Sequence, residues 1–388
     1  MILNKRDLAL TKALFFLFGL GIMAWIPRFP EVKANLGVNN GIFGIMLSVG
    51  AFGSLAALLT VGHLVDHFGA RRAMLASITL LCASFIAVVH VTNHELFIIL
   101  NILVGFSIST MHIGINAQAF FDQDRGGKNL VIAAAGYWSA GSLATTVLSM
   151  FLIGKVSLQT HITVMYLILW VLTVVVLYMR KETLVPPNKH DRVSRSIYKD
   201  LRRFNFDWII NFGLIFGIML EFSIADWSTI FTKEDVGISP SLAPLPFLVF
   251  TFFMILGRVF INALRKRYHI STLVRAGGIL AGTSFIIGIW SVHIFGLPGL
   301  ILAFSLAGLG SSYIGPAFLN VANTRNQLPS GIVVGQISAV NVVLAWILKQ
   351  IVAFLAQFTG LQVALTLPAL MLIAVGLFTR VFKPAPAK

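Results

Sequence analysis

Two carboxylates, Glu221 and Asp226, lie within the stretch EFSIADW, which has apolar sequence on both sides. A charged side chain in the interior of a bilayer is unfavourable, so such residues usually serve a proton path, a solute or an ion pair. On a helix entered at Asp207, Glu221 would lie roughly 21 Å along the axis and Asp226 roughly 28 Å, about 140° apart around it. We therefore expect them to have different roles, with Glu221 the more deeply placed of the two.

The composition is that of an integral membrane protein. Of the 388 residues, 57% are apolar and only 11% are charged, and the mean hydropathy is +0.88. A soluble domain carries about 25% charged residues, so this chain cannot cover itself with polar surface in water. The apolar runs are long and continuous, which predicts helices, because strands of a membrane barrel alternate apolar and polar residues.

Hydropathy predicts twelve membrane-spanning helices, and a charged stretch from Arg180 to Arg203 separates the sixth from the seventh. We therefore predict an all-α membrane protein with two six-helix, pseudo-symmetric bundles, residues 1–180 and 207–388, joined by a cytoplasmic linker at residues 181–206. The predicted spans are residues 8–28, 40–65, 73–91, 95–121, 130–154, 161–180, 207–231, 243–264, 273–293, 297–322, 330–355 and 361–381.

Most lysine and arginine residues fall on the side of the membrane that holds the N-terminus. Cytoplasmic loops carry an excess of these residues. We therefore predict a multi-pass protein of the cytoplasmic (inner) membrane with both termini in the cytoplasm. The same bias explains the net charge of +15 without a nucleic-acid partner. The N-terminal segment lacks a convincing cleavage site for a signal peptide, so we interpret it as the first span.

The two halves resemble each other at an offset of roughly 200 residues. Gly37 corresponds to Gly237 where the first and seventh spans end, and Ile113-Gly114 corresponds to Ile314-Gly315. Parallel repeats of this kind place a solute site near the midplane between the halves, and the halves rock to alternate access.

The connection after the second span reads GHLVDHFGARR. Its G-x-x-x-D-x-x-G-x-R-R pattern resembles the signature of the major facilitator superfamily, at the position where that family carries it. The resemblance implies that this loop gates the conformational change on the cytoplasmic face without binding solute. The gating residues that it implies are Gly62, Asp66, Gly69, Arg71 and Arg72. The second-half counterpart departs from the pattern, with Lys266 where the first half has Asp66.

Three further stretches resemble the fucose-permease-like branch of that superfamily and its uncharacterised bacterial inner-membrane relatives. They are AWIPRFPEV at the end of span 1, GYWSAGSLA in span 5 and EFSIADW in span 7. In span 4 the branch often carries an acidic residue four positions before an asparagine. Here His112 takes the acidic position and Asn116 keeps the asparagine. The two share a helix face, and a histidine can still exchange protons near neutral pH.

The candidates for proton coupling or solute binding combine titratable groups, amides and aromatic rings. A polyol offers hydroxyls that hydrogen-bond to amides and a C–H face that packs on an aromatic ring. For Glu221 the alternative is a structural ion pair or a protonated, hydrogen-bonded acid. For the uncharged candidates the alternative is interhelical hydrogen bonding or packing. The candidates are Glu221, His112, Asn116, Tyr137, Trp138, Trp25, Gln336 and Asn341.

Three charged residues near span ends have less specific interpretations. Asp226 and Arg28 are predicted at similar outer depths, where they would form an outer gate or latch. Lys349 near the same surface is expected to extend toward the interface. Arg258 in span 8 either pairs across the bundle or reaches the cytoplasmic interface.

We predict a secondary active transporter that moves a small polar, sugar-like solute by alternating access, coupled to protons. An exporter of amphipathic or drug-like molecules is the first alternative, and a non-cycling, transporter-like receptor or scaffold is the second. No enzyme motif and no metal-ligand spacing occurs in the sequence, and no cofactor is expected. The single cysteine, Cys82, excludes an intramolecular disulfide. The expected partners are the solute, protons and the bilayer, and the expected state is a monomer.

Overall fold

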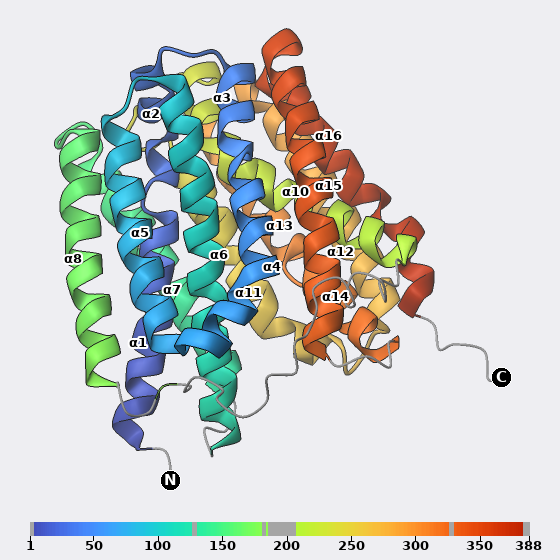
Figure 1. The fold of residues 1–388 in the computed structure, drawn as a ribbon. Helices are drawn as coiled ribbons and strands as arrows, with labels where there is room; N and C mark the ends of the chain where they lie inside the picture. Colours follow the sequence, from blue (N-terminus) through green and yellow to red (C-terminus); the bar gives the residue numbers. More distant parts are fainter. Residues whose placement is uncertain (1–3, 126–129, 181–183, 185–206, 326–329, 383–388) are drawn as a thin grey trace. The chain divides into compact units, whose positions relative to one another are not determined.

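The computed structural model describes residues 4–125, 130–180, 184, 207–325 and 330–382, and its regular elements are helices (Figure 1). The predicted linker, residues 181–206, lies outside the described residues apart from Leu184. The chain divides into two compact units, Met1–Gly37 with Met46–Arg203, and Val38–Ile45 with Phe204–Lys388. The second unit therefore includes a segment, Val38–Ile45, that the sequence assigned to the first bundle.

The six spans predicted in the first half all have helical counterparts. Span 1 is interrupted near Pro27, as expected for a residue that cannot donate a helix hydrogen bond, and it forms α1 (Lys5–Met23), η1 (Ile26–Arg28) and α2 (Phe29–Leu36). Span 2 forms α3 (Asn40–Ser48) and α4 (Gly50–Phe68). The others are α5 (Ala70–His90), α6 (His94–Asp124), α7 (Leu130–Leu152) and α8 (Leu158–Met179).

The six spans predicted in the second half also appear as helices. The Asp207 side chain accepts two backbone N–H groups and so begins α10. Span 10 is broken at Ser312 and Tyr313, and span 12 ends as a 3-10 helix. The elements are α10 (Trp208–Ile230), η2 (Phe231–Asp235), α11 (Leu245–Leu264), α12 (Ile270–Trp290), α13 (Val292–Ser311), α14 (Ile314–Arg325), α15 (Ser330–Thr359), α16 (Leu361–Ala374) and η3 (Val375–Phe382).

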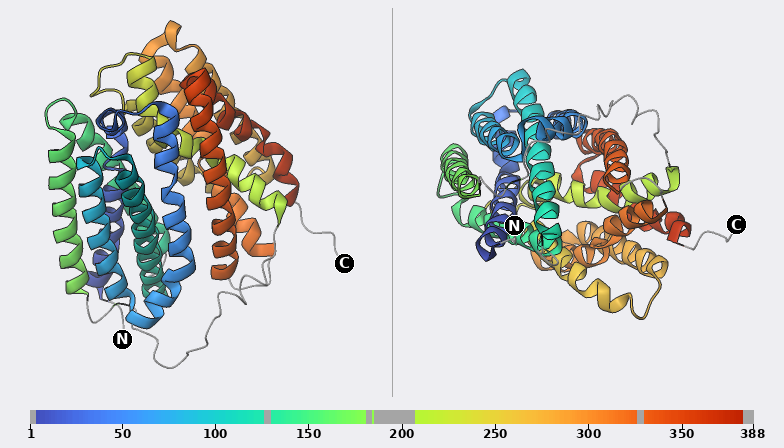
Figure 2. Two further views of the ribbon diagram at one scale, coloured as in Figure 1. Left: turned by 45° about the horizontal axis from the view of Figure 1, so that its top comes forward. Right: turned by 60° about the horizontal axis from the view of Figure 1, so that its bottom comes forward.

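Helices at corresponding places in the two units have corresponding neighbours. In the first unit α1 packs on α7, α4 on α6, and α5 on both α6 and α8. In the second unit α10 packs on α15, α11 on α13, and α12 on both α13 and α16. Figure 2 gives two further views of these packed helices. Gly37 and Gly237 both have positive φ, 65° and 77°, at the matching helix ends. The internal repeat read from the sequence is therefore present in the packing of each unit.

Glycines allow the helices of the first unit to approach closely. A Cβ on Gly53 would clash with the carbonyl of Ile102, and one on Gly141 would clash with the carbonyl of Phe16. Small residues at such contacts are typical of membrane helix packing, because they let the backbones approach. Gly141 belongs to the GYWSAGSLA stretch, so this part of the motif serves the contact between α1 and α7.

Ten helical segments of the described residues are long and apolar enough to cross a membrane. The other two predicted spans correspond to α7 and α11, and α11 includes a shorter apolar helix, Leu245–Ile261. The protein is therefore a multi-pass membrane protein. The segment Val38–Ile45 joins the second unit through the Gly41 N–H, which donates to Gln357 Oε1 at 3.1 Å, and through an edge contact of Phe43 with Trp227.

Candidate functional site

Glu221 is partly buried near the middle of α10. Among the described residues, its carboxylate forms no salt bridge and no hydrogen bond, and its electrostatic partner is Arg258 of α11. Arg258 donates from Nε to the backbone carbonyl of Ser312 at 3.0 Å, at the break between α13 and α14. Arg258 is exposed, and this hydrogen bond ties α11 to the broken helix. Glu221 therefore has an electrostatic interaction with a residue that also holds the break.

Asp226 has an ion-pair partner within its own unit. Its Oδ2 lies 2.7 Å from Lys349 Nζ of α15, and the same ammonium lies over the ring of Phe222, 5.3 Å from the centroid. Lys349, which was expected to extend toward the interface, remains partly exposed, at 26%, and pairs with Asp226. The predicted pairing of Asp226 with Arg28 is replaced, because each has another ion-pair partner. The pair joins α10 to α15, the two helices that correspond to α1 and α7.

The amides of α15 meet α10 around a small polar cavity. Asn341 is 6% exposed, and its Nδ2 donates to Asn211 Oδ1 at 3.0 Å. Gln336 Nε2 is buried and has no hydrogen-bond partner among the described residues. The cavity of about 80 Å³ is large enough for a few water molecules, but it is well below the size of a sugar site. It is lined by Asp207, Ile210, Asn211, Ala322, Arg325, Val333, Gln336 and Ile337.

His112 and Asn116 share one face of α6, as their spacing predicts. Asn116 Nδ2 donates to the backbone carbonyl of His112 at 2.8 Å. The His112 ring stacks on Phe18 of α1 with centroids 5.8 Å apart, and part of its surface remains exposed. The bond holds the Asn116 amide against its own helix, while His112 keeps an accessible imidazole edge.

Tyr137 lies at a hollow on the surface of the first unit. Its side chain is 44% exposed, and Lys12 Nζ lies over the ring at 5.6 Å from the centroid. The hollow has a volume of about 530 Å³ and is also lined by Lys5. Lys12 lies in α1. Trp138 is only partly exposed, and its backbone carbonyl packs against Gly19.

Trp25 is a core residue of the first unit. It is 7% exposed and makes edge-to-face contacts with Phe29 and Phe85, with centroids 4.9 and 5.1 Å apart. An indole enclosed in this way cannot offer its face to a solute. The expectation that Trp25 is an aromatic platform for a sugar is therefore wrong, and its role is packing.

Arg28 is almost fully buried, at 1% exposed, where the first span ends. Its Nη1 donates to Glu31 at 2.6 Å, and both terminal nitrogens donate to the carbonyl of Val156 at 3.1 Å. Its Nε donates to Nδ1 of His161 at 3.2 Å. All of these partners belong to the first unit, so Arg28 ties η1 to the start of α8.

The superfamily motif forms a helix corner rather than an extended loop. Gly62 and Asp66 lie within α4, Arg71 and Arg72 lie in the first turn of α5, and Gly69 alone separates the helices. Gly69 has φ 80° and ψ 154°, and its N–H donates to the carbonyl of Val65 at 2.8 Å. The Arg71 guanidinium lies 4.4 Å from the centroid of the Tyr178 ring on α8. The Asp66 side chain lies outside the described part of the chain.

A buried charge cluster at the opposite end of the unit from Arg28 escaped the sequence reading. Asp122 and Arg180, 0% and 1% exposed, form a bidentate pair with distances of 2.8 and 2.9 Å. Thr11 donates to Asp122 Oδ2 at 2.6 Å, and Gln118 donates to Oδ1 at 2.8 Å. Both charges lie at ends of predicted spans, where solvated charges are common. The sequence therefore showed no sign that Asp122 and Arg180, 58 residues apart, form a buried pair.

The polar candidates thus fall into separate groups in each unit. His112 and Asn116 lie together on α6, whereas Tyr137 lies with Lys12 at the hollow of α1 and α7. In the second unit Glu221 interacts with Arg258, and Asn341 and Gln336 lie on the α10-facing side of α15. These groups can exchange protons and hydrogen-bond to a polar solute.

Comparison with known proteins decides the family. The family model of the Major Facilitator Superfamily matches residues 13–348. The chain belongs to the major facilitator superfamily. A superfamily transporter from Yersinia pestis, described as uncharacterised, is 26% identical over 378 residues, which are 95% of this chain and 94% of that protein. Membrane protein MosC of Rhizobium meliloti is 23% identical over 96% of this chain and 88% of its own length.

Solved structures of superfamily transporters have the same fold. The nucleoside transporter NupG matches with a TM-score of 0.76 at 13% identity, over 98% of this chain and 100% of its own. A D-xylose–proton symporter matches with a TM-score of 0.71 at 14% identity, over 98% of this chain and 97% of its own. The superfamily and the all-α fold predicted from the motifs are therefore confirmed.

Proposed function

We propose that this transporter moves a small polar solute by alternating access and couples the movement to protons through Glu221. The observation that supports this proposal most is that the Glu221 carboxylate forms no ion pair among the described residues. Asp122 of α6 and Asp226 of α10 are held in short ion pairs. Glu221 has no such pair among the described residues and is free to take up and release a proton. An unpaired acid inside a membrane span is a typical proton carrier.

Arg258 offers a route from protonation to conformational change. The charge of Glu221 attracts the Arg258 guanidinium, which also holds the Ser312 carbonyl at the break between α13 and α14. Neutralising Glu221 removes this attraction and loosens the constraint on the broken helix. The coupling thus uses the charge of Arg258 and the Ser312 carbonyl at the α13–α14 break. Transporters with discontinuous helices also use backbone carbonyls at such breaks.

The polar groups favour a solute with several hydroxyl groups. His112, Tyr137 and Lys12 supply an imidazole, a phenol ring and an ammonium on partly exposed surfaces. Gln336 supplies an amide donor that has no hydrogen-bond partner within the described part of the chain. The two solved structures are those of a nucleoside transporter and a D-xylose–proton symporter, and nucleosides and D-xylose both carry hydroxyls. We propose a sugar or nucleoside as the solute class.

The experiment is transport in proteoliposomes with an imposed proton gradient and a panel of pentoses, hexoses and nucleosides. The Glu221→Gln variant is expected to lose proton-driven accumulation but to keep exchange of labelled for unlabelled solute, which needs no net proton movement. Glu95→Gln, the same change at an exposed position in the first turn of α6, is the control and is expected to behave like the wild type. Undiminished accumulation by Glu221→Gln would contradict the coupling role.

The orientation and the gates belong to the same proposal. The excess of lysine and arginine on the N-terminal side supports cytoplasmic termini in the inner membrane. The α4–α5 corner, with Asp66, Gly69, Arg71 and Arg72, is the proposed cytoplasmic gate. The Asp226–Lys349 pair is proposed to act at the outer end. Cysteine labelling at Lys5 and Lys155, one variant at a time, distinguishes the two sides of the membrane.

A further inference from the structure

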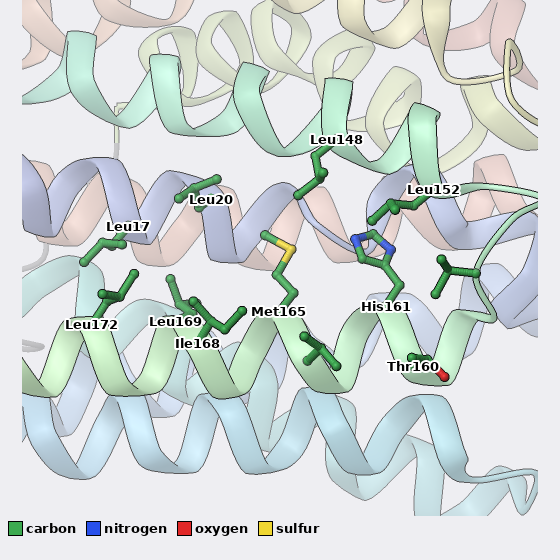
Figure 3. Close-up of a pocket in the computed structure, with 12 residues that line it drawn as sticks. Leu17, Leu20, Leu148, Leu152, Thr160, His161, Met165, Ile168, Leu169 and Leu172 are labelled. Atoms are coloured by element: carbon green, nitrogen blue, oxygen red, sulfur yellow. The ribbon is translucent and has the colours of Figure 1, made fainter.

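A long apolar groove runs along α8 of the first unit, between this helix, α1 and α7 (Figure 3). Its volume is about 390 Å³, within the range of small-molecule sites. The side chains that line it include Leu17, Leu148, Met165 and Ile168. Leu148 and Ile168 are 44% and 55% exposed, so the groove is open to its surroundings.

One end of the groove carries a polar atom that has no partner. His161 is 4% exposed, and its ring projects from α8 toward α1 and α7 in Figure 3. Arg28 donates to its Nδ1, and a guanidinium can only donate, so Nδ1 is the acceptor and Nε2 carries the proton. Within the described part of the chain, Nε2 is buried without a hydrogen-bond partner. A buried donor in this state is unfavourable until an acceptor reaches it.

The dimensions of the groove match one leaflet of a bilayer. Along α8 it extends from Thr160 to Leu172, which is about 18 Å at the rise of a helix. The hydrocarbon core of a bilayer is about 30 Å thick, so the chains of one leaflet fill about 15 Å. The polar end lies at the start of α8, and the other end points toward the middle of the span.

We propose that this groove binds one acyl chain of a phospholipid, with the ester carbonyl of that chain accepting a hydrogen bond from His161 Nε2. Met165, one turn further along the same face of α8, lies beside the His161 ring in Figure 3. Its flexible thioether, which accepts a weak hydrogen bond from Thr145 at 3.6 Å, can move aside to admit the carbonyl. Exposed Lys155 lies in the turn beside Val156, which lines the same end, and supplies a cation for the phosphate. The occupied site braces α8 against α1 and α7.

Native mass spectrometry of the full chain, titrated with a diester phosphatidylglycerol or its diether analogue, tests the proposal. The ether lipid lacks the carbonyl, so the wild type is expected to bind the first diester lipid about fivefold more tightly. His161→Phe is expected to abolish this preference without abolishing lipid binding. Equal affinity of the wild type for the two lipids would overturn the proposal.

A pair of neighbouring substitutions tests the groove without disturbing His161. Ile168→Trp fills the groove and excludes about two methylene groups, so the affinity of the first lipid is expected to fall about tenfold. Leu167→Trp is the matched control, because Leu167 is similarly exposed, at 52%, and does not line the groove. If both variants lower the affinity equally, or neither does, the lipid binds only as part of the general lipid shell and the proposal fails.

Discussion

Replacing Asp122 with asparagine removes the negative charge of the Asp122–Arg180 cluster while keeping the size of the side chain. Arg180 is 1% exposed, and without Asp122 its buried charge would lose its short bidentate partner and keep the longer ion pair with Asp7 at 3.9 Å, so we expect a destabilisation of about 3–5 kcal/mol. For a unit of this size, about 2–4 °C of melting temperature is lost per kcal/mol. We therefore expect the unfolding temperature of Asp122→Asn to fall by roughly 6–20 °C.

The single thiol of the chain provides the assay. Cys82 lies on α5 of the first unit and is 3% exposed, so a thiol-reactive fluorescent dye reports when this unit opens on heating in detergent. Asp226→Asn is the control, since the Asp226–Lys349 pair is partly exposed, at 17% and 26%, and contributes about 1 kcal/mol or less.

A second variant separates the charge from the packing. Asp122→Leu combined with Arg180→Met removes both charges together, and it is expected to recover most of the loss, since an apolar replacement of a buried pair is often neutral. A shift of less than about 3 °C for Asp122→Asn would refute the reasoning. So would a double variant no more stable than the single ones.

Three further predictions concern packing and the motif corner. Gly141→Val should lower the free energy of unfolding by about 1–3 kcal/mol, because the new side chain overpacks against the Phe16 carbonyl. Gly136→Val on the same helix should not lower it, because nothing lies near that Cβ. Trp25→Ala should destabilise by about 3–5 kcal/mol, whereas Tyr137→Ala should alter stability by about 0.5 kcal/mol or less and reduce transport. Gly69→Ala should cost about 1–3 kcal/mol, because its φ of 80° with ψ of 154° suits glycine alone. Thermal unfolding and proteoliposome uptake of each variant check these values, and equal effects within either matched pair would contradict them.

The sequence was sufficient for the fold because the fold depends on local signals. A long apolar run that spans a bilayer must satisfy its own backbone hydrogen bonds, so it folds as a helix. Each of the twelve predicted spans appears as a helix or a broken helix. Glycines with positive φ, such as Gly37 and Gly237, end helices at positions that the repeat had already matched. The motif residues identified the superfamily, which the family model confirmed.

The candidate site was less predictable because its residues have several possible partners. Trp25 and Tyr137 are both aromatic residues in motifs, yet one is enclosed in the core and the other is exposed. Helix rotation decides this difference, and the motifs contain no information about it. Asp226 was expected to pair with Arg28, but the packing of α15 on α10 places the Lys349 ammonium beside it.

By itself, the sequence determined that this is a helical membrane transporter with two related halves. It also determined that charges inside the spans, Glu221 above all, require an explanation. The tertiary structure decided which charges are paired and which are not. Asp122 meets Arg180 across 58 residues, whereas Glu221 forms no such pair among the described residues. Hydropathy is a property of each segment, but ion pairing depends on the rotation and packing of helices that are distant in the chain.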